Sequence, residues 1–312
     1  MHLVIGAAGY AGRHAVAALR DEVHIRAAGV RDDLTGAMDG VEVVHLAFEL
    51  RSPLERARGP SPHPLLVSLV RLARDAGVRR LVFLSSSAVY GLDREGRVSD
   101  RAPLRPEHGY ERALLADETW LRERDRPEVV VLRPAQGFGP DEPVSGRLFA
   151  RLRTGRLALP GGGRAPRTFL AGPDLGRAFH AAAVRGQPAA AYLLGGILGS
   201  WWELLLAAAE AMLVPGRVDR TSYDLAYLGA WGRLARSRPA RTCWPTPFAV
   251  DLLARPQVVD DGWSRRELGW RPQVATFAAG LAELLEWHTD TTPVPDPGAV
   301  AWPEAAPRRL SS

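Results

Sequence analysis

The sequence predicts an α/β fold built on a doubly wound parallel sheet, with a smaller mixed lobe towards the C-terminus. Short apolar runs rich in β-branched residues alternate with segments of helical periodicity, and this alternation is typical of parallel strands joined by right-handed crossovers. A glycine-rich turn joins the first strand to the first helix. After Pro134 the alternation becomes irregular, which indicates a mixed lobe. At 312 residues the chain exceeds an average domain of roughly 100–200 residues and has room for both parts.

The elements follow from these patterns in order. Apolar runs predict strands at residues 2–5, 43–47, 81–85 and 129–133. Helical periodicity predicts helices at residues 10–19, 64–76, 107–124, 174–184, 201–212 and 274–287. The stretch from Val23 to Asp33 is too short for two strands and a helix, so one crossover is expected to be trimmed.

Three regions are expected along the chain. Residues 1–140 form a dinucleotide-binding core, and residues 141–288 form a substrate lobe that is partly interleaved with it. Residues 214–256 of the lobe, with helical spacing, are expected to form a lid. Residues 289–312, rich in proline and small side chains, are expected to be a flexible tail.

Composition excludes several classes of protein. All 40 basic residues are arginines, and the net charge is +5, but they are dispersed among acids without the basic stripe of a nucleic-acid-binding protein. No apolar run reaches the length of about 18 residues that a membrane helix needs. The single Cys243 cannot form an internal disulfide. We therefore expect a cytoplasmic protein that acts on a small molecule; a homodimer stays open.

The first chemical motif is VIGAAGYAG, in which Gly6, Gly9 and Gly12 follow the first strand and open the first helix. Glycine permits a tight turn and a close approach of the backbone to a pyrophosphate, and the helix N-terminus, here Tyr10 and Ala11, supplies amide donors. The motif predicts a Rossmann-type dinucleotide site. Further cofactor contacts are expected at the ends of later strands, from Leu46, Ala47 and Pro134.

The second strand indicates which dinucleotide binds. Where a carboxylate usually bonds the adenine ribose, this segment has Arg26, which suits a 2′-phosphate. Asp33 and Leu34 follow where an adenine-contacting pair could lie. The pattern favours NADPH, with NADH as the alternative.

A second set of motifs carries a family resemblance. LVFLSSSAVYG at 81–91 is followed by PEHGYERAL at 106–114, and later by VVVLRPAQGFGP at 129–140, GGGRAPRTFLAGPDLGRAF at 161–179 and SRRELGWRPQVATFAAGLAELLEW at 264–287. Over residues 1–288 the chain resembles an extended short-chain dehydrogenase/reductase of the epimerase/dehydratase type. The resemblance implies that Ser86 is the active hydroxyl and Tyr110 the acid/base tyrosine.

The chain departs from that family at Leu114, where the resemblance places a lysine. The lysine bonds the nicotinamide ribose and lowers the pKa of the phenol from about 10 so that it can exchange a proton near neutrality. Leucine does neither. Oxidation of an alcohol needs a base, whereas reduction of a carbonyl needs a hydride and a proton donor, so the change favours a reductase. The acids that dehydratases of the family place after the hydroxyl are replaced by Ser87 and Ala88.

The hypothesis is thus an NADPH-dependent ketoreductase for a polycyclic aromatic polyketide, similar in type to the ketoreductases of angucyclinone antibiotic pathways such as that of simocyclinone. A non-catalytic NAD(P)-binding sensor and a sugar-nucleotide epimerase or dehydratase are the alternatives. Arg164 and Arg167 resemble the family's contacts to a substrate diphosphate and support the latter. No metal site is expected, because the histidines are scattered. Residues expected to contact substrate are Ser87, Phe138, Trp201, Tyr223 and Tyr227.

Overall fold

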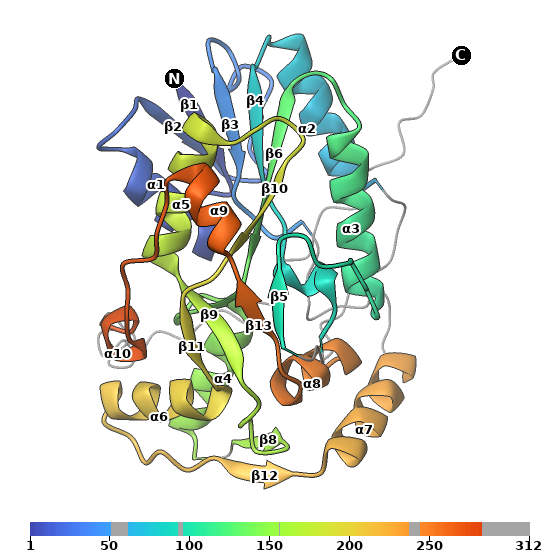
Figure 1. Cartoon of the computed structure of the whole chain (residues 1–312), viewed down its shortest axis with the longest axis vertical. Coiled ribbons are helices and arrows are strands. Elements are labelled where there is room, and N and C mark those ends of the chain that lie inside the picture. The colour runs from blue at the N-terminus through green and yellow to red at the C-terminus, as the bar shows by residue number, and fades with distance from the viewer. Residues whose placement is uncertain (51–61, 93–95, 156, 237–243, 283–312) are drawn as a thin grey trace.

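The computed structural model describes residues 1–50, 62–92, 96–155, 157–236 and 244–282. Its centre is a parallel sheet with the strand order β10-β6-β4-β3-β1-β2 (Figure 1). The strands are β1 (His2–Ile5), β2 (Ile25–Ala28), β3 (Val43–Leu46), β4 (Arg80–Leu84), β6 (Glu128–Pro134) and β10 (Ala191–Leu194). The predicted α/β class and the doubly wound sheet are confirmed.

Helices cover both faces of this sheet. On one face α1 (Tyr10–Leu19) packs against α5 (Gly172–Arg185), and on the other lie α2 (Pro64–Asp75) and α3 (Gly109–Arg122) (Figure 1). A Cβ atom at Gly176 would come within 2.2 Å of the His14 carbonyl oxygen, so glycine lets α5 approach the backbone of α1. The interior is filled by apolar side chains of the strands, since all residues of β1, β3 and β4 are buried.

The connection from β2 to β3 contains turns in place of a helix, which agrees with the predicted trimming of one crossover. As a result β2 is an edge strand that pairs only with β1 in the order of the sheet. Three of its four residues are partly or fully exposed. The turns that follow β2 therefore lie at the open side of the glycine loop.

The lobe after β6 is mixed. Strand β7 (Gln136–Phe138) pairs with β9 (Arg167–Ala171), which also pairs with β11 (Ile197–Gly199). Two further pairs join β8 (Ala158–Pro160) to β12 (Asp219–Thr221), and β5 (Arg97–Ser99) to β13 (Val258–Asp260). The helices are α4 (Pro143–Arg153), α6 (Trp201–Ala211), α7 (Tyr223–Arg236), α8 (Pro247–Ala254), α9 (Gly262–Leu268) and α10 (Phe277–Gly280), and a 3-10 turn η1 spans Ser87–Tyr90.

The chain passes between core and lobe more than once, because α5 and β10 return to the main sheet after β9. Of the helix predicted at 274–287, the described part is helical at Phe277–Gly280. The tail at 289–312 lies outside the described residues. Among the residues described, no helix is long and apolar enough to span a membrane.

Candidate active site

The glycine loop adopts a conformation that depends on its glycines. Gly6 has φ +86°, a value that side chains with a Cβ rarely adopt. A Cβ atom at Gly12 would lie 1.9 Å from the Gly6 carbonyl oxygen, so a larger residue there cannot fit. The loop ends at Gly9, the N-cap of α1, whose first turn has backbone N–H groups that lack partners within the helix.

This arrangement fits the pyrophosphate of a dinucleotide. The first-turn amides and the helix dipole favour an anion, and the missing Cβ atoms leave room for its approach. Tyr10, the first residue of α1, is held in place because its hydroxyl donates to the Phe138 carbonyl oxygen at 3.0 Å. Leu46 and Ala47 are buried at the end of β3, and Pro134 ends β6. These positions agree with the predicted cofactor site without testing it.

Arg26 has a different environment from the one expected. Its guanidinium donates to the carbonyl oxygens of Ala37 at 2.5 Å and Gly36 at 3.3 Å, so it holds the turn after β2. These bonds give Arg26 a structural role, and its contact to a 2′-phosphate stays a prediction. The exposed Arg31, three residues beyond the end of β2, is a second candidate for that contact.

The two residues expected next to the adenine differ in exposure. Leu34 is 6% exposed and packs in the core, which leaves little of it for a ligand. Asp33 is exposed, and its carboxylate accepts a bond from the Thr35 amide at 3.0 Å. That bond lowers the pKa of Asp33, so its carboxylate is charged at neutral pH.

Ser86 and Tyr110 come together as the family motif predicts. Ser86 is the N-cap of η1, its side chain accepts a bond from the Ala88 amide at 3.1 Å, and it lies near enough to the Tyr110 hydroxyl to lower the pKa of that phenol. Tyr110 lies in the first turn of α3 and is 9% exposed. Leu114, one turn further along α3, is buried. The position of the missing lysine is therefore part of the apolar core.

Carboxylates surround Tyr110. Burial and the negative charges of Glu49, Glu111 and Glu142 raise the pKa of the Tyr110 phenol well above 10, against the opposing effect of the nearby Ser86 side chain. Glu49 follows β3, and burial together with Glu142 raises its own pKa to about 8. Burial likewise raises the pKa of Glu142 to about 7. At neutral pH both the phenol and the Glu49 carboxyl hold their protons.

Glu142 reaches this site from the lobe. It is the N-cap of α4 and accepts bonds from the amides of Val144 at 3.1 Å and Ser145 at 2.6 Å. Neither Glu49 nor Glu142 was identified from the sequence, because each lies outside the motifs that mark the site. Their position after a strand of the parallel sheet and before a helix of the lobe is the only sequence signal for them.

Three of the residues expected to contact substrate are buried and contact other residues of the chain. Ser87 is buried and donates to Gln257 Oε1 at 3.0 Å. Trp201 is 1% exposed, and its Nε1 donates to the Leu252 carbonyl oxygen at 2.9 Å. Phe138 is equally buried, with its ring 5.5 Å from that of Phe277. These contacts give all three residues structural roles, and their contact with a substrate stays a prediction.

Arg167 is a buried cation that stands out in the lobe. It is 1% exposed, its Nη2 donates to the Arg255 carbonyl oxygen at 2.7 Å, and burial lowers its pKa to about 9. Its Nε and Nη1 have no hydrogen-bond partner among the described residues. Asp174 on the adjoining α5 accepts a hydrogen bond from Arg177 and not from Arg167. Arg164 stacks on Trp202, 4.0 Å from the ring centroid.

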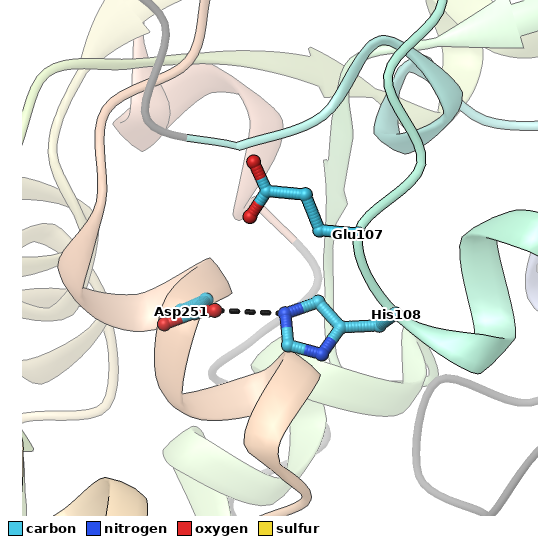
Figure 2. A group of neighbouring side chains, drawn as sticks. All are labelled: Glu107, His108 and Asp251. Atoms are coloured by element: carbon cyan, nitrogen blue, oxygen red, sulfur yellow. Dashed lines mark hydrogen bonds and ion pairs between the residues drawn. The ribbon is translucent and has the colours of Figure 1, made fainter.

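Three side chains lie close together at the start of α3, those of Glu107, His108 and Asp251 (Figure 2). The atoms with which they could bind a metal ion all lie within 4.8 Å of one another. The sequence analysis expected no such cluster, because Asp251 is 143 positions from His108 and the two meet only when α8 packs on α3. His108 Nε2 lies 2.7 Å from Asp251 Oδ2. Tyr223, whose ring stacks on Tyr227 at 5.5 Å, donates to Asp251 Oδ1 at 2.6 Å.

Comparison with known proteins agrees with this geometry. The chain is 28% identical to the dTDP-D-glucose 4,6-dehydratase of Mus musculus over 227 residues, which are 70% of this chain and only 58% of that protein. It is 29% identical over 276 residues to the 4-hydroxy-2-methyl-3-oxo-4-farnesyl-3,4-dihydroquinoline-1-oxide ketoreductase of Stigmatella aurantiaca, covering 82% of this chain and 80% of the relative.

Among solved structures, MoeE5 in complex with UDP-glucose and NAD has the same fold, with a TM-score of 0.70, 23% identity, and coverage of 92% of this chain and 97% of MoeE5. The family model "NAD dependent epimerase/dehydratase family" matches residues 2–195. Because that match spans more than half of the 312 residues and contains the glycine loop, Ser86 and Tyr110, this chain belongs to the NAD dependent epimerase/dehydratase family.

Proposed function

We propose that the protein is an NADPH-dependent ketoreductase that reduces a carbonyl of a polycyclic aromatic polyketide, as angucyclinone-type ketoreductases do. The observation that carries the proposal is the electrostatic state of Tyr110. Its neighbour at position 114 is a buried leucine, and its own burial, together with the nearby acidic groups, keeps the phenol protonated. Such a site can give a proton or hydrogen bond to a carbonyl oxygen, and is poorly suited to take a proton from an alcohol.

Each residue has a role in this reaction. When bound, the dinucleotide supplies a hydride to the carbonyl carbon. Tyr110 and Ser86 donate hydrogen bonds where negative charge develops on the oxygen, which lowers the barrier most in a water-poor site. Glu49, protonated at neutral pH, is a second acid near Tyr110. A ketone with an internal phenol hydrogen bond needs less help still, since its oxygen is already polarised.

The ketoreductase of Stigmatella aurantiaca supports a ketone as substrate. It acts, by its name, on the ketone of a bicyclic quinoline, and its similarity extends over most of both chains. The UDP-glucose 4-epimerase of Mycolicibacterium smegmatis is 28% identical and is matched over 84% of this chain and 82% of its own length, so the extent of similarity supports a sugar-nucleotide substrate equally.

The experiment is an assay of reduction and of its reverse. The protein is mixed with NADPH and a panel of aromatic ketones while the absorbance of the reduced nicotinamide is followed, and with NADP⁺ and the product alcohols. Reduction of a ketone with much slower oxidation supports the proposal. Binding of NADPH without reduction of any ketone would favour the non-catalytic sensor, and oxidation as fast as reduction would refute the electrostatic argument.

A second candidate is a sugar-nucleotide epimerase or dehydratase, and Arg167 favours it. A buried guanidinium with two nitrogens unbonded by described residues suits an anionic ligand such as a diphosphate. Incubation with UDP-glucose or dTDP-glucose and NMR analysis of the sugar would detect epimer or 4-keto product. Either product would replace the ketoreductase proposal.

A further inference from the structure

The Asp251 carboxylate joins three elements of the molecule. It lies on α8 and is 1% exposed. Its Oδ2 is 2.7 Å from His108 Nε2 at the start of α3 (Figure 2). Its Oδ1 accepts a hydrogen bond from the Tyr223 hydroxyl of α7 at 2.6 Å. Arg255, one turn further along the chain, donates from Nε to Oδ1 at 3.1 Å. A single carboxylate therefore ties α7 and α8 to the helix that carries Tyr110.

The neighbouring Glu107 raises the question of a bound cation. Both oxygens of Asp251 already face donors, and the charge of Arg255 compensates the carboxylate. A divalent ion would have to displace His108 or compete with the guanidinium. The hydrogen bonds of Asp251 with His108, Tyr223 and Arg255 thus hold α7 and α8 to the start of α3, and we call this contact the joint between the helices.

The joint determines where Phe248 lies. Phe248 is three residues before Asp251 on α8, so both side chains face α3. Its ring centroid is 4.8 Å from that of Tyr110 with an interplanar angle of 46°, and 5.7 Å from that of His108. Phe248 is 5% exposed. A carbonyl that accepts a hydrogen bond from Tyr110 would place its own ring near Phe248.

We propose that Asp251 is a positioning residue that holds Phe248 against Tyr110, and that Phe248 is the wall of the substrate site that selects a flat aromatic ring. The inference rests on the proposed function for its substrate class. Contacts between aromatic rings favour one ligand over a saturated one of equal size by about two- to tenfold. This preference is expected in KM, because the ring is held alike in the ground state and the transition state.

The kinetic test compares 1-tetralone with trans-1-decalone, two bicyclic ketones of similar size of which only the first is aromatic. Phe248→Ala and Asp251→Asn should each raise KM for 1-tetralone about five- to tenfold, change kcat less than about threefold, and leave decalone nearly unaffected. Because Asp251 acts through Phe248, the double variant should be no worse than Phe248→Ala. Phe248→Tyr, which keeps the ring, should restore the preference.

Asp219→Asn is the control, since this exposed aspartate pairs with Arg217 in the same lobe; its KM should match wild type. Multiplicative effects in the double variant, or equal KM changes for both ketones, would overturn the inference.

A second measurement reads the joint without any substrate. Asp251→Asn should speed hydrogen exchange of the backbone amides at 223–236 and 247–254, while exchange in α1 and α2 stays unchanged. Unaltered exchange at 247–254 would refute the positioning role. Faster exchange there with no reduction of either ketone would refute the proposed function and the aromatic wall, and would support the joint between the helices.

Discussion

Replacing Glu49 by glutamine tests the electrostatics of the site directly. Burial and Glu142 raise the pKa of Glu49 to about 8, against an ordinary value near 4.5. A carboxyl with a raised pKa binds its proton more tightly in the folded protein than in the unfolded chain. Its stabilising effect is therefore complete below about pH 4.5 and is lost as the pH rises through about 8.

These two pKa values give the magnitude. Between pH 6 and pH 9 the wild type should lose about 2–3 kcal/mol of unfolding free energy through Glu49 alone, a loss that Glu49→Gln should not show. Urea unfolding at several pH values in this range, without cofactor, measures the difference between the two slopes. Glu142 titrates at about 7 in both proteins and does not account for it.

Glu42→Gln is the matched control for that series. Glu42 is exposed and bonded to Arg79, which lowers its pKa, so it is ionised throughout the range and its replacement should leave the slope unchanged. Parallel pH profiles of unfolding free energy for wild type and Glu49→Gln would show that Glu49 is ionised at neutral pH. The statement that Glu49 holds its proton there would then be wrong.

Three further outcomes are expected. Leu114→Lys should lower stability by about 2–4 kcal/mol in chemical unfolding, since an ammonium would enter a site that is 3% exposed, and it should not raise kcat/KM for ketone reduction by more than about tenfold. Arg31→Ala should reduce the difference in binding free energy between NADPH and NADH, measured by titration, by about 1–2 kcal/mol. Arg26→Ala should leave that difference unchanged and lower the stability of the fold. The opposite result would identify Arg26 as the phosphate contact. Burial lowers the pKa of His45 to about 3, so this histidine favours folding above pH 6.5 and opposes it increasingly as the pH falls; replacement by Phe should remove about 2 kcal/mol of the stability lost between pH 7 and pH 5, and equal acid sensitivity in both proteins would contradict this.

The sequence predicted those parts of the molecule that depend on local patterns. Gly6 and Gly12 are required by the turn itself, and Ser86 and Tyr110 lie in short motifs, so each could be recognised from its neighbours in the chain. The apolar strands likewise predicted the sheet. The hydrogen bonds of Arg26 could not be predicted, because nothing local reveals that a turn 10 to 13 residues later offers it carbonyl oxygens.

The parts that the sequence did not predict are contacts between distant segments. Glu49 and Glu142 acquire their raised pKa values only when strand, helix and lobe exclude water from them. Asp251 meets His108 across 143 positions, and the aromatic wall of Phe248 depends on that meeting. An isolated tryptophan such as Trp201 carries no sign of whether it packs in a core or faces a ligand.

The loss of the lysine and the presence of the carboxylates act in the same direction. An ordinary phenol with a pKa near 10 already costs about 4 kcal/mol to ionise at pH 7, or about a thousandfold in the population of the base. Leu114 alone would leave that cost in place, while burial and the charges of Glu49, Glu111 and Glu142 increase it. At neutral pH the phenolate that could take a proton from an alcohol is therefore much rarer in this site than in one with a lysine-assisted tyrosine whose pKa is near 7. Reduction starts from the protonated phenol, and this is the form that burial keeps at neutral pH, so the site in its resting state is ready to donate to a carbonyl oxygen.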